Sequence, residues 1–182
     1  MKKERIFNIT ILIAAFLLAI FVKNFIFGFV RVSGTSMYPT IENGQILPIN
    51  KSYTRLFKKD LHRGDIIVVK SKELNKDIIK RLIALPGDSL EIKDGELYIN
   101  GAIQAEPYID RTFNDNMMLS EKTTITREEF KELHSSLIGR EYKKTLKAGE
   151  YFVMGDNRLN SEDSRMLGPV SYKDVMGVVK VR

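Results

Sequence analysis

The longest apolar run in the chain lies close to its N-terminus. The 17 residues from Ile6 to Val22 carry no charge and are interrupted by only two polar side chains. A helix that crosses a membrane needs about 20 apolar residues, and about 17 is the lower limit. Lys23 follows, and its long side chain can extend toward the lipid headgroups from a position near a helix end. The pattern therefore predicts a transmembrane anchor over residues 6–24.

A cleavable secretory signal shares this pattern, because it also joins a basic start to a short apolar run. Such a signal needs small residues at its exit, whereas Lys23, Asn24 and Phe25 follow the apolar run here. This favours an anchor that is retained. Basic residues next to a span stay on the cytoplasmic side of the membrane. We therefore expect a cytoplasmic basic tail over residues 1–5 and an extracytoplasmic catalytic domain over residues 25–182.

Beyond the anchor, the polar and apolar positions predict mostly short β-strands. Alternating positions or runs of β-branched residues mark each strand, and Gly, Pro, Asn or Asp mark the turns. The expected strands cover residues 65–70, 77–85, 89–93, 96–100, 151–154 and 174–181. Turn signals stand at Pro86-Gly87-Asp88, Asp94-Gly95 and Asn100-Gly101. The predicted fold class is mostly β, with neighbouring strands paired as antiparallel hairpins.

Residues 111–147 interrupt this pattern with a polar and charged stretch. Thr126 and Glu129 have the spacing of a capping box, which satisfies the first backbone N–H groups of a helix. Apolar residues at helical spacing follow, and Gly139 can end the helix. We expect a short helical insertion between two β segments.

Composition and charge narrow the chemistry. The chain has no cysteine and two histidines, His62 and His134, which excludes disulfides, thiolate nucleophiles and cysteine-ligated zinc. We expect neither a metal nor another cofactor. Residues 1–31 carry five basic residues and one acidic residue, a net +4, and the other 24 basic and 22 acidic residues leave +2. The basic excess thus lies around the anchor, which favours a membrane surface rather than nucleic acid as a partner.

Three segments combine residues that can carry chemistry: SGTSMYPT at 33–40, KRLIALPGD at 80–88 and GDNRLNSEDSR at 155–165. Each has an ordinary interpretation when it stands alone. A serine beside Gly and Pro is usually a turn residue, a lysine in a strand usually lies on the polar face, and Gly-Asp-Asn-Arg is usually a tight loop. Their order and combination in one chain point to a site.

Lys80 lies within an apolar strand. Alternation places it on the same face as Ile78, Leu82 and Ala84, while Arg81 lies on the opposite face. Burial disfavours a charged amine and lowers its pKa, and a neutral amine can accept a proton from a serine hydroxyl. The other interpretation is that the Lys80 side chain reaches solvent along its own stem. This segment alone leaves both interpretations open.

Taken together, the segments resemble bacterial type I signal peptidases, the membrane-anchored serine proteases that remove signal peptides from exported proteins. The motifs that match, in the family order behind the anchor, are Ser36-Met37-Tyr38-Pro39-Thr40, Gly64-Asp65-Ile66-Ile67-Val68, Lys80-Arg81 with Leu85-Pro86-Gly87-Asp88, Gly155-Asp156-Asn157-Arg158, and Ser161 with Asp163-Ser164-Arg165. The short length and single anchor are similar to the Gram-positive forms. The resemblance implies a signal-peptidase-type β-fold with antiparallel sheets and cleavage after small residues.

The resemblance also implies a role for each matching residue. Ser36 corresponds to the family nucleophile and Lys80 to its general base. Ser161 matches a serine whose hydroxyl orients the base. Asp163 matches an acid that pairs with a nearby arginine, here Arg165, and supports the site.

The resemblance also implies how the substrate is bound. Met37 falls where the family packs a side chain near the substrate pocket. The oxyanion hole includes the backbone N–H of Ser36, and some members add a serine hydroxyl at the position that is Gly34 here, so no side-chain donor is assigned. An extended substrate is expected to add to an exposed strand edge. The patch from Phe25 to Val30 would hold the site at the membrane surface. Expected partners are secretory preproteins and membrane lipid, with the secretion translocon nearby.

Three other readings compete with this one. A self-cleaving repressor-type Ser-Lys protease has a similar fold, but such proteins are soluble, and the anchor argues against it. A catalytically dead relative that serves as an assembly chaperone would lack the serine or the lysine, whereas Ser36 and Lys80 are both present. A plain anchored β-domain that binds a partner leaves the motifs unexplained. The sequence therefore predicts an anchored serine endopeptidase that uses a Ser-Lys dyad.

Overall fold

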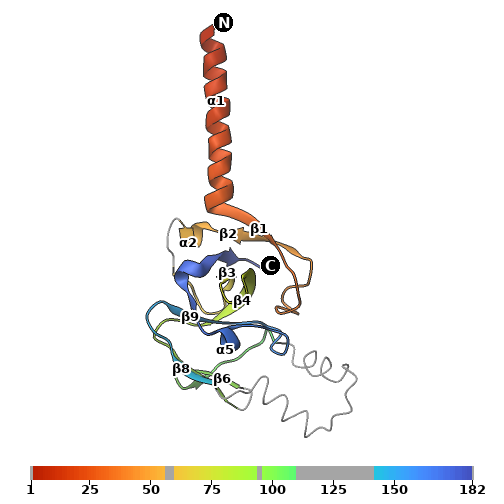
Figure 1. Ribbon diagram of the computed structural model, residues 1–182, viewed down its shortest axis with the longest axis vertical. Coiled ribbons are helices and arrows are strands. Elements are labelled where there is room, and N and C mark those ends of the chain that lie inside the picture. Colours follow the sequence, from red (N-terminus) through yellow and green to blue (C-terminus); the bar gives the residue numbers. More distant parts are fainter. Residues whose placement is uncertain (1, 56–59, 94–95, 110–141, 182) are drawn as a thin grey trace.

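A single long helix leads into a β-rich body. The computed structural model describes residues 2–55, 60–93, 96–109 and 142–181. Helix α1 (Lys2–Phe21) continues into a short π-helix (Val22–Ile26) and projects from one end of the body (Figure 1). The stretch Lys3–Ile26 contains an 18-residue window with a mean hydropathy of 2.4, none of which is buried, and is long and apolar enough to cross a membrane. The predicted anchor is thus helical, and its apolar window is exposed.

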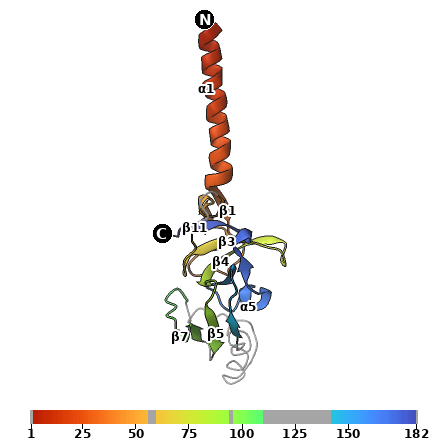
Figure 2. The same cartoon turned by 90° about the vertical axis from the view of Figure 1, so that its left-hand side faces the viewer.

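The described part of the body contains two antiparallel sheets. The larger sheet has seven strands, in the order β1 (Phe27–Arg31), β2 (Ile46–Asn50), β11 (Val175–Val179), β3 (Ile66–Ser71), β4 (Lys76–Ala84), β9 (Glu150–Met154) and β10 (Val170–Ser171). The smaller sheet has four, in the order β7 (Ala102–Ile103), β6 (Glu96–Ile99), β5 (Ser89–Lys93) and β8 (Tyr142–Thr145). Figure 2 shows the smaller sheet, with β5 and β7, at the end of the body away from α1.

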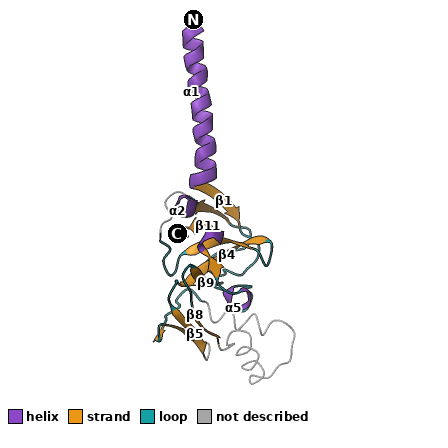
Figure 3. Ribbon diagram, turned by 60° about the vertical axis from the view of Figure 1, so that its left-hand side comes forward, coloured by secondary structure: helices purple, strands orange, loops and turns teal. Residues whose placement is uncertain are grey.

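Helices play a small part in the body. Among the residues that the structure describes, they are α2 (Ser52–Arg55), α5 (Ser164–Leu167) and a 3₁₀ turn (Tyr172–Asp174). Figure 3 shows how short α2 and α5 are beside α1. The mostly β fold predicted from the sequence is confirmed.

The predicted strands are all present, with ends that differ by at most a few residues. Residues 89–93 and 96–99 form the expected hairpin, in which Leu90 pairs with Ile99 and Lys93 with Glu96. Its predicted turn at 94–95 lies outside the described residues. The turn at Asn100-Gly101 joins β6 to β7, and both residues have positive φ angles, 54° and 80°. Such angles are typical of a tight hairpin turn.

Most of the expected insertion at 111–147, including its helix, lies outside the described residues. Its last part is described. Tyr142–Thr145 forms strand β8 and pairs along β5, with Tyr142 opposite Ile92 and Thr145 opposite Ser89. The alternation of Tyr, Lys, Lys and Thr is too polar to stand out as a strand, and its pairing with β5 is what defines it.

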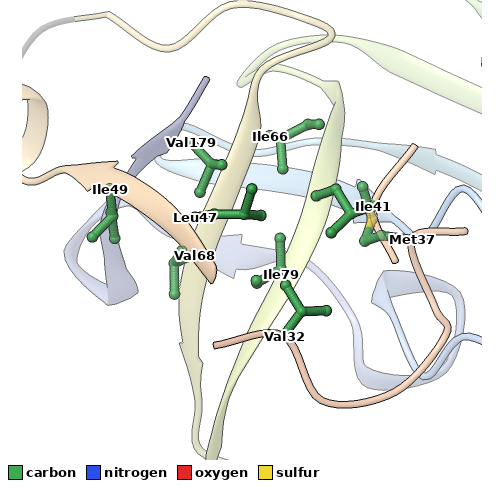
Figure 4. Close-up of a cluster of buried hydrophobic side chains, with 9 residues drawn as sticks. All are labelled: Val32, Met37, Ile41, Leu47, Ile49, Ile66, Val68, Ile79 and Val179. Atoms are coloured by element: carbon green, nitrogen blue, oxygen red, sulfur yellow. The ribbon is translucent and has the colours of Figure 1, made fainter. Parts of the chain in front are cut away.

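Strand β4 connects the hydrophobic cores. Its Ile79 belongs to a cluster on one face of the larger sheet (Figure 4), Ile78 and Leu82 belong to the cluster on the other face, and Ile83 and Ala84 belong to the core under the smaller sheet. Every one of these side chains is at least nine-tenths buried. A strand held from both faces gives a rigid base for any residue that it carries.

One edge of β4 is only partly covered. On one side, β4 pairs with β3 from Lys76 opposite Ser71 to Arg81 opposite Ile66. On the other side, β9 pairs with β4 only from Arg81 onward. In the described part of the chain, the edge of β4 over residues 76–80 therefore has no strand beside it.

Candidate active site

Ser36 lies on a turn that is packed onto the larger sheet. The side chains that follow it, Met37 and Ile41, are 2% and 0% exposed and enter the cluster drawn in Figure 4. Burying an apolar side chain of this size contributes about 1.5–3 kcal/mol. The carbonyl of Ser36 accepts a hydrogen bond from the backbone N–H of Asn157, at 3.0 Å. These contacts fix the backbone of Ser36 and leave its side chain half-buried.

Lys80 reaches Ser36 from strand β4. Its Nζ lies 2.7 Å from Ser36 Oγ, within hydrogen-bonding distance. Lys80 is 3% exposed, and Ile78, Leu82 and Ala84 on the same face are buried as well. The reading in which the Lys80 side chain reaches solvent is thus wrong. Strand β4 thus brings the Lys80 amine to the Ser36 hydroxyl while the side chain stays buried.

The environment of Lys80 favours its neutral form. Burial lowers the pKa of the amine from 10.5 to about 8. The nearby carboxylate of Asp163 opposes this change, and a smaller repulsion comes from Lys76. A substantial fraction of the amine is therefore neutral near pH 8, and only a neutral amine can take a proton from a hydroxyl.

Asp163 is fully buried near Lys80, and its carboxylate accepts hydrogen bonds from several donors. Its carboxylate accepts from Nε and Nη2 of Arg165, at 2.8 and 2.9 Å, and from the backbone N–H of Gly155, at 3.0 Å. It also caps the N-terminus of α5 by accepting the Arg165 backbone N–H. Although burial alone would raise the pKa of this carboxyl, the Arg165 pair and the Gly155 hydrogen bond lower it. Asp163 is therefore a carboxylate, and it supplies a fixed negative charge near Lys80.

Ser161 lies beside Gly155. Its buried hydroxyl has no hydrogen-bond partner among the described residues. A Cβ atom on Gly155 would collide with both the Ser161 side chain and the carbonyl of Ser36. The glycine thus lets the loop that carries Ser161 and Asp163 approach the backbone of Ser36 closely.

A groove of about 760 Å³ passes the Ser36–Lys80 pair. Residues 30–37 line one part of it, residues 76–80 of β4 line another, and residues 159–162 line a third, together with Met166. Met37 contributes to this lining, although it is 2% exposed and belongs to the core. In the described part of the chain, no group of three or more His, Asp or Glu side chains is placed to hold a metal ion.

Sequence reasoning missed a network of ion pairs behind the site. Arg81 donates to both carboxylate oxygens of Asp156, at 2.8 and 2.6 Å, and its guanidinium stands 4.0 Å from the ring centre of Tyr108. Arg158 forms a buried ion pair with Glu106. The arginines and Asp156 lie within the quoted motifs, but no sequence pattern links Glu106 or Tyr108 to them. Glu106, for example, lies 52 residues before Arg158 in the chain.

Comparison with known proteins decides the family. A family model described as "Signal peptidase, peptidase S26" matches residues 5–182. The chain belongs to the signal peptidase family. It is a serine peptidase that removes signal peptides from secreted preproteins.

Individual relatives agree with this assignment. The peptidase is 37% identical over 170 residues to "Signal peptidase I T" of Bacillus subtilis, a match that covers 93% of this chain and 80% of the relative. It is 39% identical to "Signal peptidase I" of Bacillus licheniformis, over 97% of this chain and 87% of the relative. The crystal structure of a signal peptidase I from Enterococcus faecalis matches with a TM-score of 0.51 and 33% identity, over 67% of this chain and 98% of that chain. These matches confirm the resemblance stated from the motifs, and the rival readings are dropped.

Proposed function

We propose that Ser36 is the nucleophile and Lys80 the general base of this signal peptidase. The observation that carries the proposal is the 2.7 Å contact between Lys80 Nζ and Ser36 Oγ in a site where the amine is buried. The Ser-Lys pair is an established variant of nucleophile activation that needs no histidine. In keeping with this, the exposed side chain of His62 lies beside Asp65 and does not line the groove.

The proposed reaction proceeds in two halves. Neutral Lys80 takes the proton of Ser36 as Oγ attacks the carbonyl carbon of the scissile peptide bond. The resulting alkylammonium then gives that proton to the departing amine as the C–N bond breaks, which leaves an ester on Ser36. In the second half, Lys80 takes a proton from water, the hydroxide attacks the ester, and the proton returns to Ser36 as the signal peptide leaves with a new carboxylate.

The oxyanion is assigned to the backbone N–H of Ser36. This N–H donates to no acceptor among the described residues, so it is available to the substrate. Gly34 has no side chain to act as a second donor, as expected from the sequence. A pre-oriented donor at the developing charge can be worth about 10²–10³ in rate.

Ser161, Asp163 and Arg165 are assigned supporting roles. The Ser161 hydroxyl is buried, and its oxygen can accept a hydrogen bond from the Lys80 amine and orient it. Asp163 holds the loop through Gly155 and Arg165, and its charge acts on the amine.

The open edge of β4 supports a mode of substrate binding. A preprotein segment that runs along residues 76–80 can form main-chain hydrogen bonds there, as an added strand does. The edge ends at Lys80, because β9 covers β4 from Arg81 onward. This brings the scissile bond beside the dyad, with Met37 contributing to the pocket wall. Small side chains at the cleavage point fit a groove whose walls are already packed.

We infer that residues 6–24 anchor the peptidase, with residues 1–5 in the cytoplasm and the domain from residue 25 on the opposite side. The basic start supports this orientation. Phe25, Phe27, Phe29 and Ile46 are 41–79% exposed, on the part of the body next to α1. Such a patch is suited to the lipid surface where a preprotein's own apolar helix arrives.

The test of the assigned roles is cleavage of a preprotein by the detergent-solubilised protein, with the Ser36→Ala variant beside it. The wild type is expected to release the mature protein and the variant to leave the preprotein intact. Cleavage by the variant at the wild-type rate would refute the assignment of Ser36.

Removal of residues 1–24 should leave a folded peptidase that cleaves membrane-embedded preproteins more slowly than the full-length protein does. Strand β1 keeps its partner β2, and Ile26 keeps its hydrogen bond from Lys51. We expect kcat/KM on a soluble peptide to stay within about twofold. Cleavage of a preprotein in liposomes should fall on the order of 10²-fold, because the anchor confines enzyme and substrate to one surface. Equal losses on both substrates, with an unchanged circular dichroism spectrum, would contradict the role of a tether.

A further inference from the structure

The turn that carries Ser36 is held by hydrogen bonds at each of three successive residues. The backbone N–H of Gly34 donates to Asn43 Oδ1, at 3.0 Å. The hydroxyl of Thr35 accepts from Asn160 Nδ2, at 2.8 Å. The carbonyl of Ser36 accepts from the backbone N–H of Asn157, at 3.0 Å. Two of these bonds use asparagine side chains, from two different loops.

These bonds enclose the peptide unit whose N–H is assigned to the oxyanion. That unit joins Thr35 to Ser36 and is trans. Its carbonyl, on Thr35, accepts the backbone N–H of Tyr38, at 3.0 Å. In a trans peptide the C=O and N–H groups point in opposite directions. Because the Thr35 carbonyl points into the turn, the N–H of Ser36 points away from it and is left without an acceptor among the described residues.

The loops that supply the asparagines are themselves fixed. Asn43 precedes Gly44, whose N–H donates to the Val32 carbonyl at 2.9 Å, while the N–H of Val32 donates to Gln45 at 2.8 Å. The backbone N–H of Asn160 donates to the carbonyl of Asn157, at 3.2 Å. Each asparagine side chain therefore extends from a backbone that is tied either to the base of the Ser36 turn or to Ser36 itself.

Gly34 makes this support necessary. Its φ angle of +100° is one that residues with a side chain rarely adopt, and a glycine restrains the chain less than any other residue. Since Gly34 also provides no side-chain donor, the stabilisation of the oxyanion rests on one backbone N–H. The rate then depends on how well that single donor is oriented.

We propose that Asn43 and Asn160 are positioning residues that fix the Thr35–Ser36 peptide and so aim the oxyanion donor in the absence of a side-chain donor. The proposal rests on the proposed role of Ser36 as nucleophile. Neither asparagine touches the reacting atoms. Each acts through a neighbour of the nucleophile, Asn43 through Gly34 and Asn160 through Thr35.

The test compares transition-state and ground-state effects in the full-length protein in detergent. For Asn43→Ala and for Asn160→Ala we expect kcat on a soluble peptide to fall roughly threefold to tenfold with KM unchanged, the size of one hydrogen bond. The affinity for a peptide aldehyde, which forms a tetrahedral adduct with the nucleophile, should fall by the same factor. Asn43→Asp keeps an acceptor for the Gly34 N–H and should restore kcat. Gln104→Ala, which removes a half-buried amide just after β7 and away from the groove, is the control and should change nothing.

A double-mutant cycle tests the second bond. Thr35→Val removes the acceptor and keeps the shape of the side chain, so it should match Asn160→Ala, and the two together should lose no more than either alone. Unchanged kcat in both asparagine variants, a rise in KM alone, or a fall in kcat without loss of aldehyde affinity would overturn the proposal. Cleavage by Ser36→Ala would instead overturn the assignment of the nucleophile, so the two failures are distinguishable.

Discussion

Replacing either Ser36 or Lys80 by alanine is expected to abolish cleavage, by a factor on the order of 10⁶ in kcat. The two residues act as one unit, because the serine is a poor nucleophile until the amine takes its proton. The double variant should therefore be no worse than either single variant. The measurement is the rate at which a soluble peptide is cleaved by each purified protein.

Three further variants keep this result interpretable. Lys80→Met retains the length of the buried side chain without a charge, so it should fold as well as the wild type and be equally inactive. His62→Ala should retain nearly full activity, since His62 is exposed and lies away from the groove. His134 lies outside the described residues, and His134→Ala is likewise expected to be nearly silent. An inactive histidine variant combined with an active Lys80→Ala would show that the base is misassigned.

Asp163→Asn is expected to lower the free energy of unfolding by about 3–5 kcal/mol, because it leaves the largely buried charge of Arg165 without its partner. An amide has one acceptor oxygen, whereas the carboxylate accepts from Arg165 with both oxygens and from Gly155 as well. For a chain of this length the melting temperature should fall by about 6–20 °C. Thermal unfolding followed by circular dichroism measures the change.

The same substitution has a second expected effect, on the base. The Asp163 carboxylate raises the pKa of Lys80, so its loss should lower that pKa, and the remaining activity should begin to rise at a lower pH than in the wild type. For the stability effect, Glu162→Gln is the matched control, since the exposed pair of Glu162 with Lys76 is worth under about 1 kcal/mol. Glu162 also raises the pKa of Lys80, though less than Asp163 does, so the pH effect of Glu162→Gln should have the same direction and be smaller. Equal stability of the two variants would contradict the structural role given to Asp163.

The sequence was most informative where local pattern and local contact coincide. Alternation along residues 77–85 identified the strand face of Lys80, whereas the burial of its amine was left open and is seen only in the structure. Turn signals also predicted the hairpin of β5 and β6, because these two strands are neighbours in the chain and pair with each other.

The sequence pattern gave no signal where a structural feature depends on residues that are distant in the chain. Strand β1 follows the anchor directly, and its aromatic residues were read only as a membrane patch, because its pairing with β2, with Phe29 opposite Pro48, has no local signal. The ion pair of Glu106 with Arg158 and the hydrogen bonds from Asn43 and Asn160 carry no local signature. They arise only when the fold brings separate loops together, and so no spacing rule could have identified them.

The pH dependence of kcat/KM on a soluble peptide tests the central claim most directly, because it reports the ionisation of the free enzyme's base. Burial lowers the pKa of Lys80 to about 8, and the protonated amine is inactive. The account therefore predicts that kcat/KM rises about tenfold per pH unit through the neutral range and levels off above pH about 8. A profile that is flat from acid to neutral pH, with the chemical step shown to limit the rate, would contradict a lysine base.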